Sequence, residues 1–555
     1  MTDRPTDSPT PVLVVAGMHR SGTSFLASAL HRAGCAMGDD LLPADSHNRR
    51  GYFEDIEFLE LNRRMLAATT AADSPGHPDW GWTERVDAAP SEGDLEAFVA
   101  DADALVTRHR RAATDRGVRC WGWKDPRTSV LLDFWNARVP DARYVFVYRA
   151  PWDVANSMQR LCADLFLERP DFAYRIWHHY NRELLAFARR HRDRTVLVHA
   201  SALVRDPGSL IELLRARFGI ELDAGATGSV AEPALMMAAA PGVAALASVV
   251  HPECHELLAT LESFADLPLG EPLPVPRIAP SAAERPQVTI VIPCFNDGEY
   301  LVDAIASVER TVAAPYELLI VNDGSRDLHT LGLLDRLRRA GYRVIDQENE
   351  GLARARNRGI AEAGAEIVLP LDADNQLLPQ FVDAALEVLA RSPSVMGVYG
   401  DRRESGLRSG RVAVGVPDLD RLLCGNYIDA CAVIRREAWR ACGGYDATMP
   451  AQGMEDWDLW LSMLERGFTL HRLDMETFDY RVRPGSMLSR TQAPDVRASL
   501  ERYVLAKHAS FYLQELRRHV DRLETLSSRV AEMESQETDR RRPWLSRVLA
   551  RLRGR

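Results

Sequence analysis

The chain has 555 residues, enough for about two or three domains with sizeable cores. Its composition is that of a soluble globular protein, with 46% hydrophobic residues, 26% charged residues and a mean hydropathy of -0.22. The formal net charge of -11 gives no general reason to expect nucleic-acid binding, and the 8 cysteines form no Cys-x-x-Cys pair, which argues against a zinc module or a disulfide framework.

The start of the chain is polar. Residues 1–10 lack the apolar core of a signal peptide, and no later stretch is apolar and long enough to span a membrane. We therefore expect a disordered leader over residues 1–10 and a protein that works in the reducing cytoplasm.

A phosphate-binding loop is predicted directly after the leader. Residues 12–15 are an apolar run typical of a buried strand, and the loop that follows opens into a helical pattern. Backbone N–H groups and the helix dipole make such a turn an anion site. A Walker A loop has Lys after its second glycine, whereas this chain has Thr23 there and places a cation, Arg20, inside the loop. The expected phosphate-binding residues are Gly17, Arg20, Ser21, Gly22, Thr23 and Ser24.

Two later segments continue this pattern. Residues 144–148 read as a second buried strand, and the turn and helix after it carry Arg149 and Ser157. A guanidinium and a hydroxyl together suit a phosphomonoester, which plain ATP lacks. A third segment, Trp-Lys-Asp-Pro-Arg at residues 123–127, lies between the loop and this pair. In this order the three segments resemble the sulfotransferase family, whose loop is written R-S-G-T-[ST].

The resemblance implies a P-loop α/β domain that uses 3'-phosphoadenosine 5'-phosphosulfate as sulfuryl donor. Arg149 and Ser157 would bind the 3'-phosphate, and Lys124 would contact the transferring group. Fixed cations such as Arg20 and Lys124 can stabilise the charge that builds on the leaving oxygen. A base must take the acceptor proton. Glu54 stands where related enzymes carry a glutamate base, and the alternative for it is a surface acid on an early helix.

A connector is predicted between residues 232 and 285. An Ala/Met-rich helical piece is followed by a segment, residues 266–276, that is dense in proline and favours a semi-rigid extended spacer. We place the domain boundary here. The first domain then covers residues 11–231 and the second covers residues 286–490.

The second domain begins as a series of strands that end in polar residues. Asn296, Asp323 and the pair Asp372 and Asp374 each follow an apolar run. Ligands of open α/β sheets bind beyond the carboxyl ends of the strands, and two aspartates there can present a divalent cation to a diphosphate. The alternative is a solvated turn, which Asp and Asn favour. No G-x-G-x-x-G follows the first strand, so a nicotinamide dinucleotide is disfavoured.

Four motifs in this domain occur in a recognisable order: I-P-x-[FY]-N, V-N-D-G-S, N-x-G-L-A-x-A-R-N-x-G and L-D-A-D. They resemble the family 2 glycosyltransferases, which have the GT-A fold. The resemblance implies that Asn296, Asp323 and Arg356 contact the nucleotide-sugar donor. It implies that Mg²⁺ or Mn²⁺ is bound by the D-x-D acids. Because Asn375 stands where many relatives have another Asp, Asp374 is the expected ligand, with Asp372 supporting it or reaching the sugar-nucleotide.

The general base of such an inverting enzyme comes from a later acidic motif. Glu455 and Asp456 match the family's E-D pair, with Asp456 as the expected base. Acidic residues in the first turn also stabilise a helix, which is compatible with this role. The Q-x-x-R-W signature of processive synthases is absent, so one sugar is expected per event.

Residues 491–555 read as a C-terminal helix and a basic tail. A partly heptad apolar stripe indicates a helix that docks on the domain or pairs with another copy in a homodimer. The segment 540–555 is basic and amphipathic and has a Trp, so it either lies on the inner face of a membrane or is a frayed tail.

The sequence therefore predicts a cytoplasmic, bifunctional α/β transferase with a nucleotide-sugar donor, a phosphosulfate donor and a glycan or glycolipid acceptor. In one alternative only the glycosyltransferase domain is active and the P-loop domain is a binding or scaffold module. In another the whole chain is a glycan-assembly scaffold without chemistry. A P-loop kinase is disfavoured by Thr23 and by the pair of Arg149 and Ser157.

Overall fold

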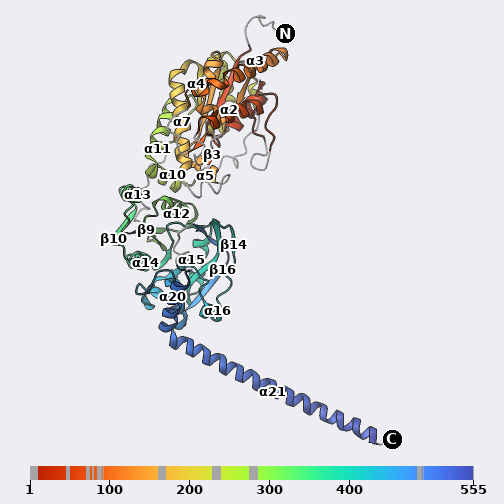
Figure 1. The fold of residues 1–555 in the computed structure, drawn as a ribbon, viewed down its shortest axis with the longest axis vertical. Coiled ribbons are helices and arrows are strands. Elements are labelled where there is room, and N and C mark those ends of the chain that lie inside the picture. Colours follow the sequence, from red (N-terminus) through yellow and green to blue (C-terminus); the bar gives the residue numbers. More distant parts are fainter. Residues whose placement is uncertain are drawn as a thin grey trace.

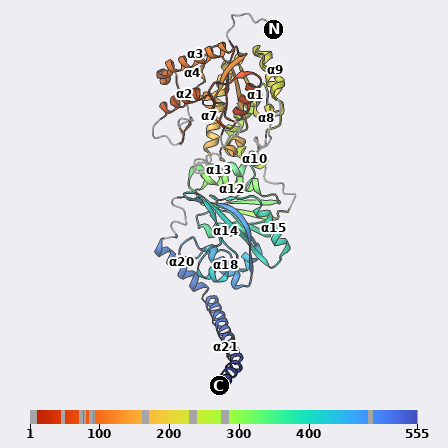
Figure 2. The ribbon, with the colours of Figure 1, turned by 90° about the vertical axis from the view of Figure 1, so that its right-hand side faces the viewer.

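The computed structural model describes two α/β bodies, one after the other along the long axis, with a long helix leaving the second body (Figures 1 and 2). This agrees with the predicted fold class, which the structure confirms as mixed α/β. The residues that the structure describes are 10–44, 51–70, 76–77, 81–83, 90–91, 93–159, 171–227, 239–273, 285–483, 491 and 493–553.

The first body is built on a five-stranded parallel sheet in the order β2-β5-β1-β6-β7. A parallel sheet is covered on both faces, so its strands are almost entirely buried and mainly apolar. Helices α1 (Thr23–Arg32) and α9 (Pro207–Phe218) cover one face, and α2 (Ile56–Ala68), α3 (Val99–Asp115) and α7 (Phe172–Arg190) cover the other. The strands are β1 (Val12–Ala16), β2 (Cys35–Ala36), β5 (Cys120–Lys124), β6 (Arg143–Tyr148) and β7 (Thr195–His199).

The second body has a nine-stranded mixed sheet. Its first half is parallel, in the order β10-β9-β8-β11, and its second half continues through β15, β13, β16 and β12, with β14 beside β13. The carboxyl ends of the parallel strands face the same edge of the sheet. The strands are β8 (Val288–Cys294), β9 (Tyr316–Asp323), β10 (Arg343–Gln347), β11 (Ile367–Pro370), β12 (Gln376–Leu377), β13 (Val395–Gly406), β14 (Gly410–Val412), β15 (Val433–Arg435) and β16 (Thr469–Val482).

One helix of the connector is shared by the two cores. In α10 (Pro241–Val250), Ala244 and Ala247 pack in the core of the first body, whereas Val243, Leu246, Val249 and Val250 pack in that of the second. Helix α11 (Pro252–Phe264) then returns to the first body, where Leu258 and Leu261 are buried.

The described part of the proline-rich segment is extended but docked. Leu267 pairs in parallel with Val198, beside the edge strand β7. The carboxylate of Asp266 accepts hydrogen bonds from Arg192 at 2.8 Å and from Arg217 at 2.6 Å. These contacts attach residues 266–267 to the first body.

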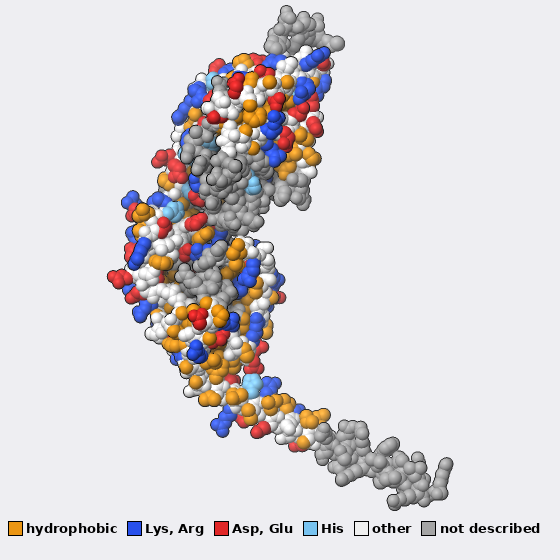
Figure 3. Space-filling view, in the orientation of Figure 1, with side chains coloured by type: hydrophobic (Ala, Val, Ile, Leu, Met, Phe, Trp, Pro, Cys, Tyr) orange, Lys and Arg blue, Asp and Glu red, His pale blue; other side chains and the backbone are white. Residues whose placement is uncertain are grey.

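The C-terminal region is helical. In α20 (Pro494–Lys507), Leu500 and Val504 are buried against the second body, whereas α21 (Ala509–Arg553) projects away from it (Figure 1). Hydrophobic side chains remain exposed along the start of α21 (Figure 3). The side chains of the basic segment 540–555 lie outside the described residues. In the described part of the chain, no helix has the length and apolarity needed to cross a bilayer.

Candidate functional sites

The predicted phosphate loop connects β1 to the start of α1. Position 17 has room only for glycine, because a Cβ there would lie 2.4 Å from the carbonyl oxygen of Val147. Arg20 and Gly22 both have left-handed backbone conformations, with φ of 66° and 94°. Within the described residues the hydroxyl of Ser21 is buried and has no hydrogen-bond partner. A polar ligand in the loop would supply the missing partner.

The residues predicted to bind a 3'-phosphate lie beside this loop. The Nε of Arg20 donates to the Oγ of Ser157, on α5 (Pro151–Gln159), at 2.9 Å. Arg149 follows β6 and is buried, and its Nε lies 3.5 Å from the carboxylate of Asp153. Arg20 therefore contacts one of the two residues predicted to bind a 3'-phosphate, and the structure brings the loop and the second segment together.

Lys124 ends β5 and joins three parts of the chain. Its Nζ donates to Glu54 Oε1 at 2.6 Å, to the carbonyl of Tyr52 at 2.9 Å and to Ser24 Oγ at 3.2 Å. Glu54 is 5% exposed. The alternative of a surface acid is therefore wrong for Glu54, which is buried next to the Lys that faces the phosphate loop. Whether it acts as a base stays a prediction.

The surroundings of this pair are also positively charged. The buried Arg127 lies 3.7 Å from Glu54 and 2.9 Å from Asp125. Burial, followed by the positive charge of Arg127 and then of Lys124, holds the pKa of His19 well below its usual value. His19 is therefore neutral near pH 7, and the site's positive charge resides on Lys and Arg.

In the second body, Asp323 ends β9 and anchors a loop. Its Oδ1 accepts from the backbone N–H of Glu350 at 2.9 Å and from Gln347 at 2.8 Å, and its Oδ2 accepts from the N–H of Gly351 at 2.9 Å. Asn296, after β8, accepts from the N–H groups of Arg326 and Asp327 in the same way. Both residues thus shape the strand-end loops at which the sequence predicts a nucleotide.

Arg356 links the two acidic motifs. On α14 (Leu352–Ala361), its guanidinium donates to Asp372 Oδ1 at 2.6 Å and to Glu455 Oε1 at 2.9 Å. It lies 5.5 Å from the ring of Tyr445, and within the described residues its buried Nε has no partner. Burial works against the charge, but the two carboxylates outweigh it and raise the pKa of Arg356. The residue is a fixed cation between the D-x-D motif and the predicted base.

Asp374 lies at the same edge and pairs with an arginine that the sequence analysis did not identify. Its Oδ2 accepts from Arg483 Nε at 2.8 Å, and the same guanidinium donates to Asp297 at 2.7 Å. Burial, together with the negative charges of Asp372 and Asp297, raises the pKa of Asp374 to about 6 although Arg483 opposes the shift. Asn375 is structural, because its amide oxygen accepts from the N–H of Arg481 at 3.2 Å.

Asp456 occupies the first turn of α18 (Glu455–Glu465). Its Oδ2 accepts from Asn426 at 2.9 Å. Burial, followed by the negative charges of Glu455 and Asp429, raises the pKa of Asp456 to about 8. A carboxyl with this pKa is mostly protonated at pH 7 and becomes a proton acceptor as the pH rises through about 8.

Sequence reasoning missed several acidic and basic groups of this edge. Asp297 directly follows Asn296, so the strand-end rule that selected Asn296 could have found it. Asp429 and Arg483 lie in no motif, and only the fold brings them to the site.

Geometry suited to a metal also occurs elsewhere. In the described part of the chain one group of three residues, Asp55, Glu57 and His109, has ligand atoms within 4.8 Å of one another. Asp55 already accepts the N–H groups of Glu57 and Phe58 as the N-cap of α2, and Glu57 pairs with Arg108. These contacts explain the cluster as part of the fold.

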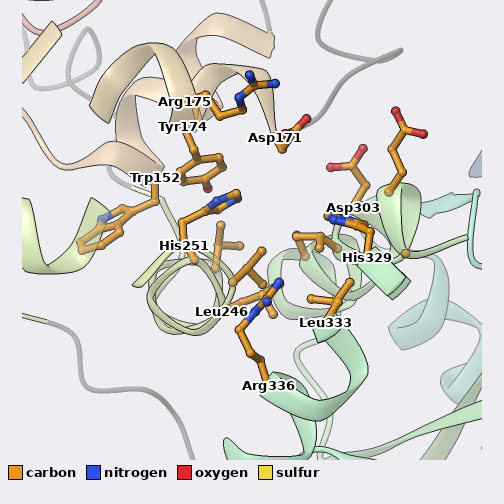
Figure 4. Close-up of a pocket in the computed structure, with 18 of the residues that line it drawn as sticks. Trp152, Asp171, Tyr174, Arg175, Leu246, His251, Asp303, His329, Leu333 and Arg336 are labelled. Atoms are coloured by element: carbon orange, nitrogen blue, oxygen red, sulfur yellow. The ribbon is translucent and has the colours of Figure 1, made fainter. Parts of the chain in front are cut away.

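A cavity of about 840 Å³ lies between the two bodies (Figure 4). Tyr174 stacks on His251 at one side, with ring centroids 4.2 Å apart, and Asp303 and His329 come from the second body. The cavity reaches the predicted sites at Asn296, and its wall residue Asp303 pairs with Arg481 at 2.9 Å. It contains neither Lys124 nor Asp456.

Comparisons with known proteins match the two bodies separately. The Sulfotransferase family matches residues 11–224, and Glycosyl transferase family 2 matches residues 289–442.

Relatives of known sequence match only a segment of this chain. The chondroitin synthase of Pasteurella multocida is 26% identical over 192 residues, which are 34% of this chain and 20% of that protein. The putative glycosyltransferase EpsE of Bacillus subtilis is 25% identical over 210 residues, 35% of this chain and 73% of that protein. The chain thus spans a small part of the length of the synthase.

Among solved structures, S. aureus TarS 1-349 in complex with UDP-GlcNAc is 17% identical, with a TM-score of 0.33, and the match covers 40% of this chain and 66% of that chain.

The two family matches cover different bodies and follow each other along the chain. The chain is therefore similar to the Sulfotransferase family over its first body and to Glycosyl transferase family 2 over its second, in the order that the predicted fusion requires.

Proposed function

We propose that the protein is a bifunctional transferase. Its first domain transfers a sulfuryl group from 3'-phosphoadenosine 5'-phosphosulfate to a hydroxyl, and its second transfers a sugar from a nucleotide-sugar with inversion. The observation that carries the proposal is the pairing of the two reactive groups in each body: Lys124 with Glu54 in the first, and Arg356 with Asp372 and Glu455 in the second. Each pairing lies where the strands of its sheet end.

Sulfuryl transfer is proposed as an in-line displacement. The acceptor oxygen forms a bond to sulfur while the bond from sulfur to the bridging oxygen of the nucleotide breaks. The hydroxyl proton passes to Glu54, and the leaving oxygen keeps the electron pair of the broken bond. Lys124, which already contacts the loop residue Ser24, stabilises the charge on that oxygen, and Arg20, Arg149 and Ser157 hold the nucleotide.

Sugar transfer is proposed as a single displacement at the anomeric carbon. The acceptor oxygen forms the new bond, the bond from that carbon to the diphosphate breaks, and the acceptor proton passes to Asp456. The raised pKa of Asp456 makes it a stronger base than an ordinary aspartate. Arg356, whose Nε is free within the described residues, supplies a donor at the donor site, and Asp323 and Asn296 fix the loops around it.

The donor set at this site fits a divalent cation. Asp372, Asp374 and Asp297 offer carboxylate oxygens, which Mg²⁺ and Mn²⁺ prefer. The carboxylates of Asp374 and Asp297 share the single guanidinium of Arg483. We propose Asp374 as the ligand with Asp372 in support. When bound, such an ion supplies positive charge that favours departure of the diphosphate.

A second candidate function keeps the sugar transfer and makes the first body a binding module for a nucleotide or sulfated group. The buried, unpartnered hydroxyl of Ser21 and the cationic loop support binding by either account. The buried ion pair of Lys124 and Glu54 favours chemistry, because a binding module does not need a buried acid beside its phosphate loop.

A thermal-shift panel on the full chain tests both sites. Adenosine 3',5'-bisphosphate should raise the melting temperature without metal, and one nucleotide-sugar should raise it only with Mn²⁺. No shift with the bisphosphate would remove the sulfotransferase half. No shift with any nucleotide-sugar would remove the sugar-transfer half.

The projecting helix α21 supports a further part of the proposal, a homodimer. Arg517 and Glu524 flank the apolar stripe. If two helices paired antiparallel, Arg517 of one copy would lie near Glu524 of the other. The side chains exposed on the stripe include Leu513, Leu516, Val520, Leu523, Val530 and Met533. We propose that a second copy covers this stripe.

Sedimentation of the full chain tests the dimer. The protein should sediment as a dimer, and Leu516→Asp with Leu523→Asp should make it a monomer. A wild-type monomer that floats with anionic vesicles would show a membrane contact instead and contradict the dimer.

A further inference from the structure

Two carboxylates at the sugar-transfer site share one guanidinium. Arg483 Nε donates to Asp374 Oδ2 at 2.8 Å, and its Nη2 donates to Asp297 Oδ1 at 2.7 Å. All three side chains are less than a third exposed, with values of 29%, 19% and 25% for Arg483, Asp374 and Asp297. A guanidinium that spans two partly buried carboxylates is held more strongly than a surface ion pair.

The position of Arg483 is fixed by the strand that precedes it. Arg483 follows the last residue of β16, and Arg481 lies two positions earlier, so the two side chains point to the same side. Both guanidinium groups lie 4.9 Å from the ring of Tyr300. Their partners differ: Arg481 donates to Asp303 and to the backbone carbonyl of Asp374, whereas Arg483 donates to the carboxylate of Asp374.

The site remains short of positive charge in this arrangement. The carboxylates of Asp297 and Asp374 carry two negative charges and share the one positive charge of Arg483. Asp372 is the third carboxylate of this edge, and its Oδ1 is bonded to Arg356. A divalent ion would satisfy these groups, but it cannot share oxygens with the guanidinium without repulsion between the two cations.

We propose that Arg483 is a built-in competitor of the divalent cation, so that the ion binds at Asp374 only when the guanidinium leaves that carboxylate. This inference rests on the proposed sugar transfer and concerns the same site. Arg483 is then a positioning residue, since it keeps the carboxylates paired and their side chains in place in the absence of the ion. The affinity of the protein for the ion alone then depends on how much more strongly the two carboxylates bind the ion than they bind the guanidinium.

Mn²⁺ titration of the full chain, without nucleotide, tests this competition. Free Mn²⁺ is measured by electron paramagnetic resonance. Arg483→Gln should bind Mn²⁺ about tenfold more tightly than the wild type, as expected for loss of a charge-assisted pair. Adding Asp374→Asn to Arg483→Gln should remove the gain, because the ligand itself is lost.

Two further variants control the charge and the fold. Arg343→Gln removes one positive charge from a surface cluster with Glu317 and Glu362, far along the sheet, and should leave Mn²⁺ affinity unchanged. Arg483→Lys keeps the charge but cannot bridge two carboxylates with a planar fork, so it should give an intermediate gain. It also serves as the test if Arg483→Gln does not fold.

Unchanged or weaker Mn²⁺ binding in folded Arg483→Gln would overturn the competition. The competition would also be overturned if neither the wild type nor Arg483→Gln bound any Mn²⁺. Failure of the proposed function has a different outcome: the wild type would turn over no nucleotide-sugar at saturating Mn²⁺, whatever the titrations show.

Discussion

The two sites of this protein follow the same structural rule with opposite charges. In both bodies the reactive groups gather where parallel strands end. The first site is dominated by cations: Arg20, Lys124, Arg127 and Arg149 outnumber the acids paired with them. The second site is dominated by carboxylates: among the described residues, the charges of Arg356, Arg402 and Arg483 oppose those of Asp297, Asp372, Asp374, Asp429, Glu455 and Asp456.

This difference indicates how each site would receive an anionic donor. We expect the first to bind a nucleotide directly, because its positive charge is covalently part of the chain. We expect the second to repel a diphosphate until a cation joins the carboxylates. We therefore expect the first reaction to be independent of divalent ions and the second to require them.

The sharpest way to separate the sites is to remove the predicted base of the second. Asp456→Asn keeps the shape of the side chain and removes the proton acceptor, so sugar transfer should fall about a thousandfold. Sulfuryl transfer by the same preparation should not change. The rates are measured with separate radiolabelled donors, and Asp420→Asn, an exposed acid outside the site, is the control. Equal loss of both activities would mean that the sites are not independent.

The corresponding change in the first site is Lys124→Met. It removes the cation beside the leaving oxygen, so sulfuryl transfer should fall about a hundredfold. Sugar transfer should remain at the wild-type rate, and Arg110→Gln, which breaks a surface pair with Asp141, should affect neither. A Lys124→Met protein with wild-type sulfuryl transfer would exclude Lys124 from the reaction.

The pH dependence of sugar transfer should reflect Asp456. Its pKa is raised to about 8, so below that pH the carboxyl is protonated and cannot accept a proton. The kcat/KM for sugar transfer should therefore rise about tenfold between pH 7 and pH 9 and then level off. The residual activity of Asp456→Asn should lack this rise, and the same rise in that variant would assign the titration to another group.

The smallest effect is expected for donor binding at the first site. Arg20→Ala removes the guanidinium that contacts Ser157, so the Kd for adenosine 3',5'-bisphosphate should increase about fivefold. Calorimetry with and without EDTA should give the same Kd in each protein. A Kd that depends on divalent ions would contradict the contrast between the two sites.

The sequence was sufficient for the fold class and for the residues that end strands. Strand-and-loop motifs predicted Arg20, Lys124, Asp323 and Asp374, because strand, turn and helix starts are encoded locally. The roles of these residues stay predictions. Arg483 and Asp429 could not be found in this way, since each reaches the site through a long-range sheet pairing or a loop without a motif. Ion pairs between distant segments depend on the tertiary fold.

The shared helix α10 determines how the enzyme can be dissected. Because its residues belong to both cores, a cut before Pro241 removes α10 and α11 from the first half and exposes the apolar surface that they cover, and a cut after Val250 removes α10 from the core of the second half. Each half expressed alone should need its own copy of α10 to remain soluble. A natural separation of the two activities by gene fission would likewise require this helix to be duplicated.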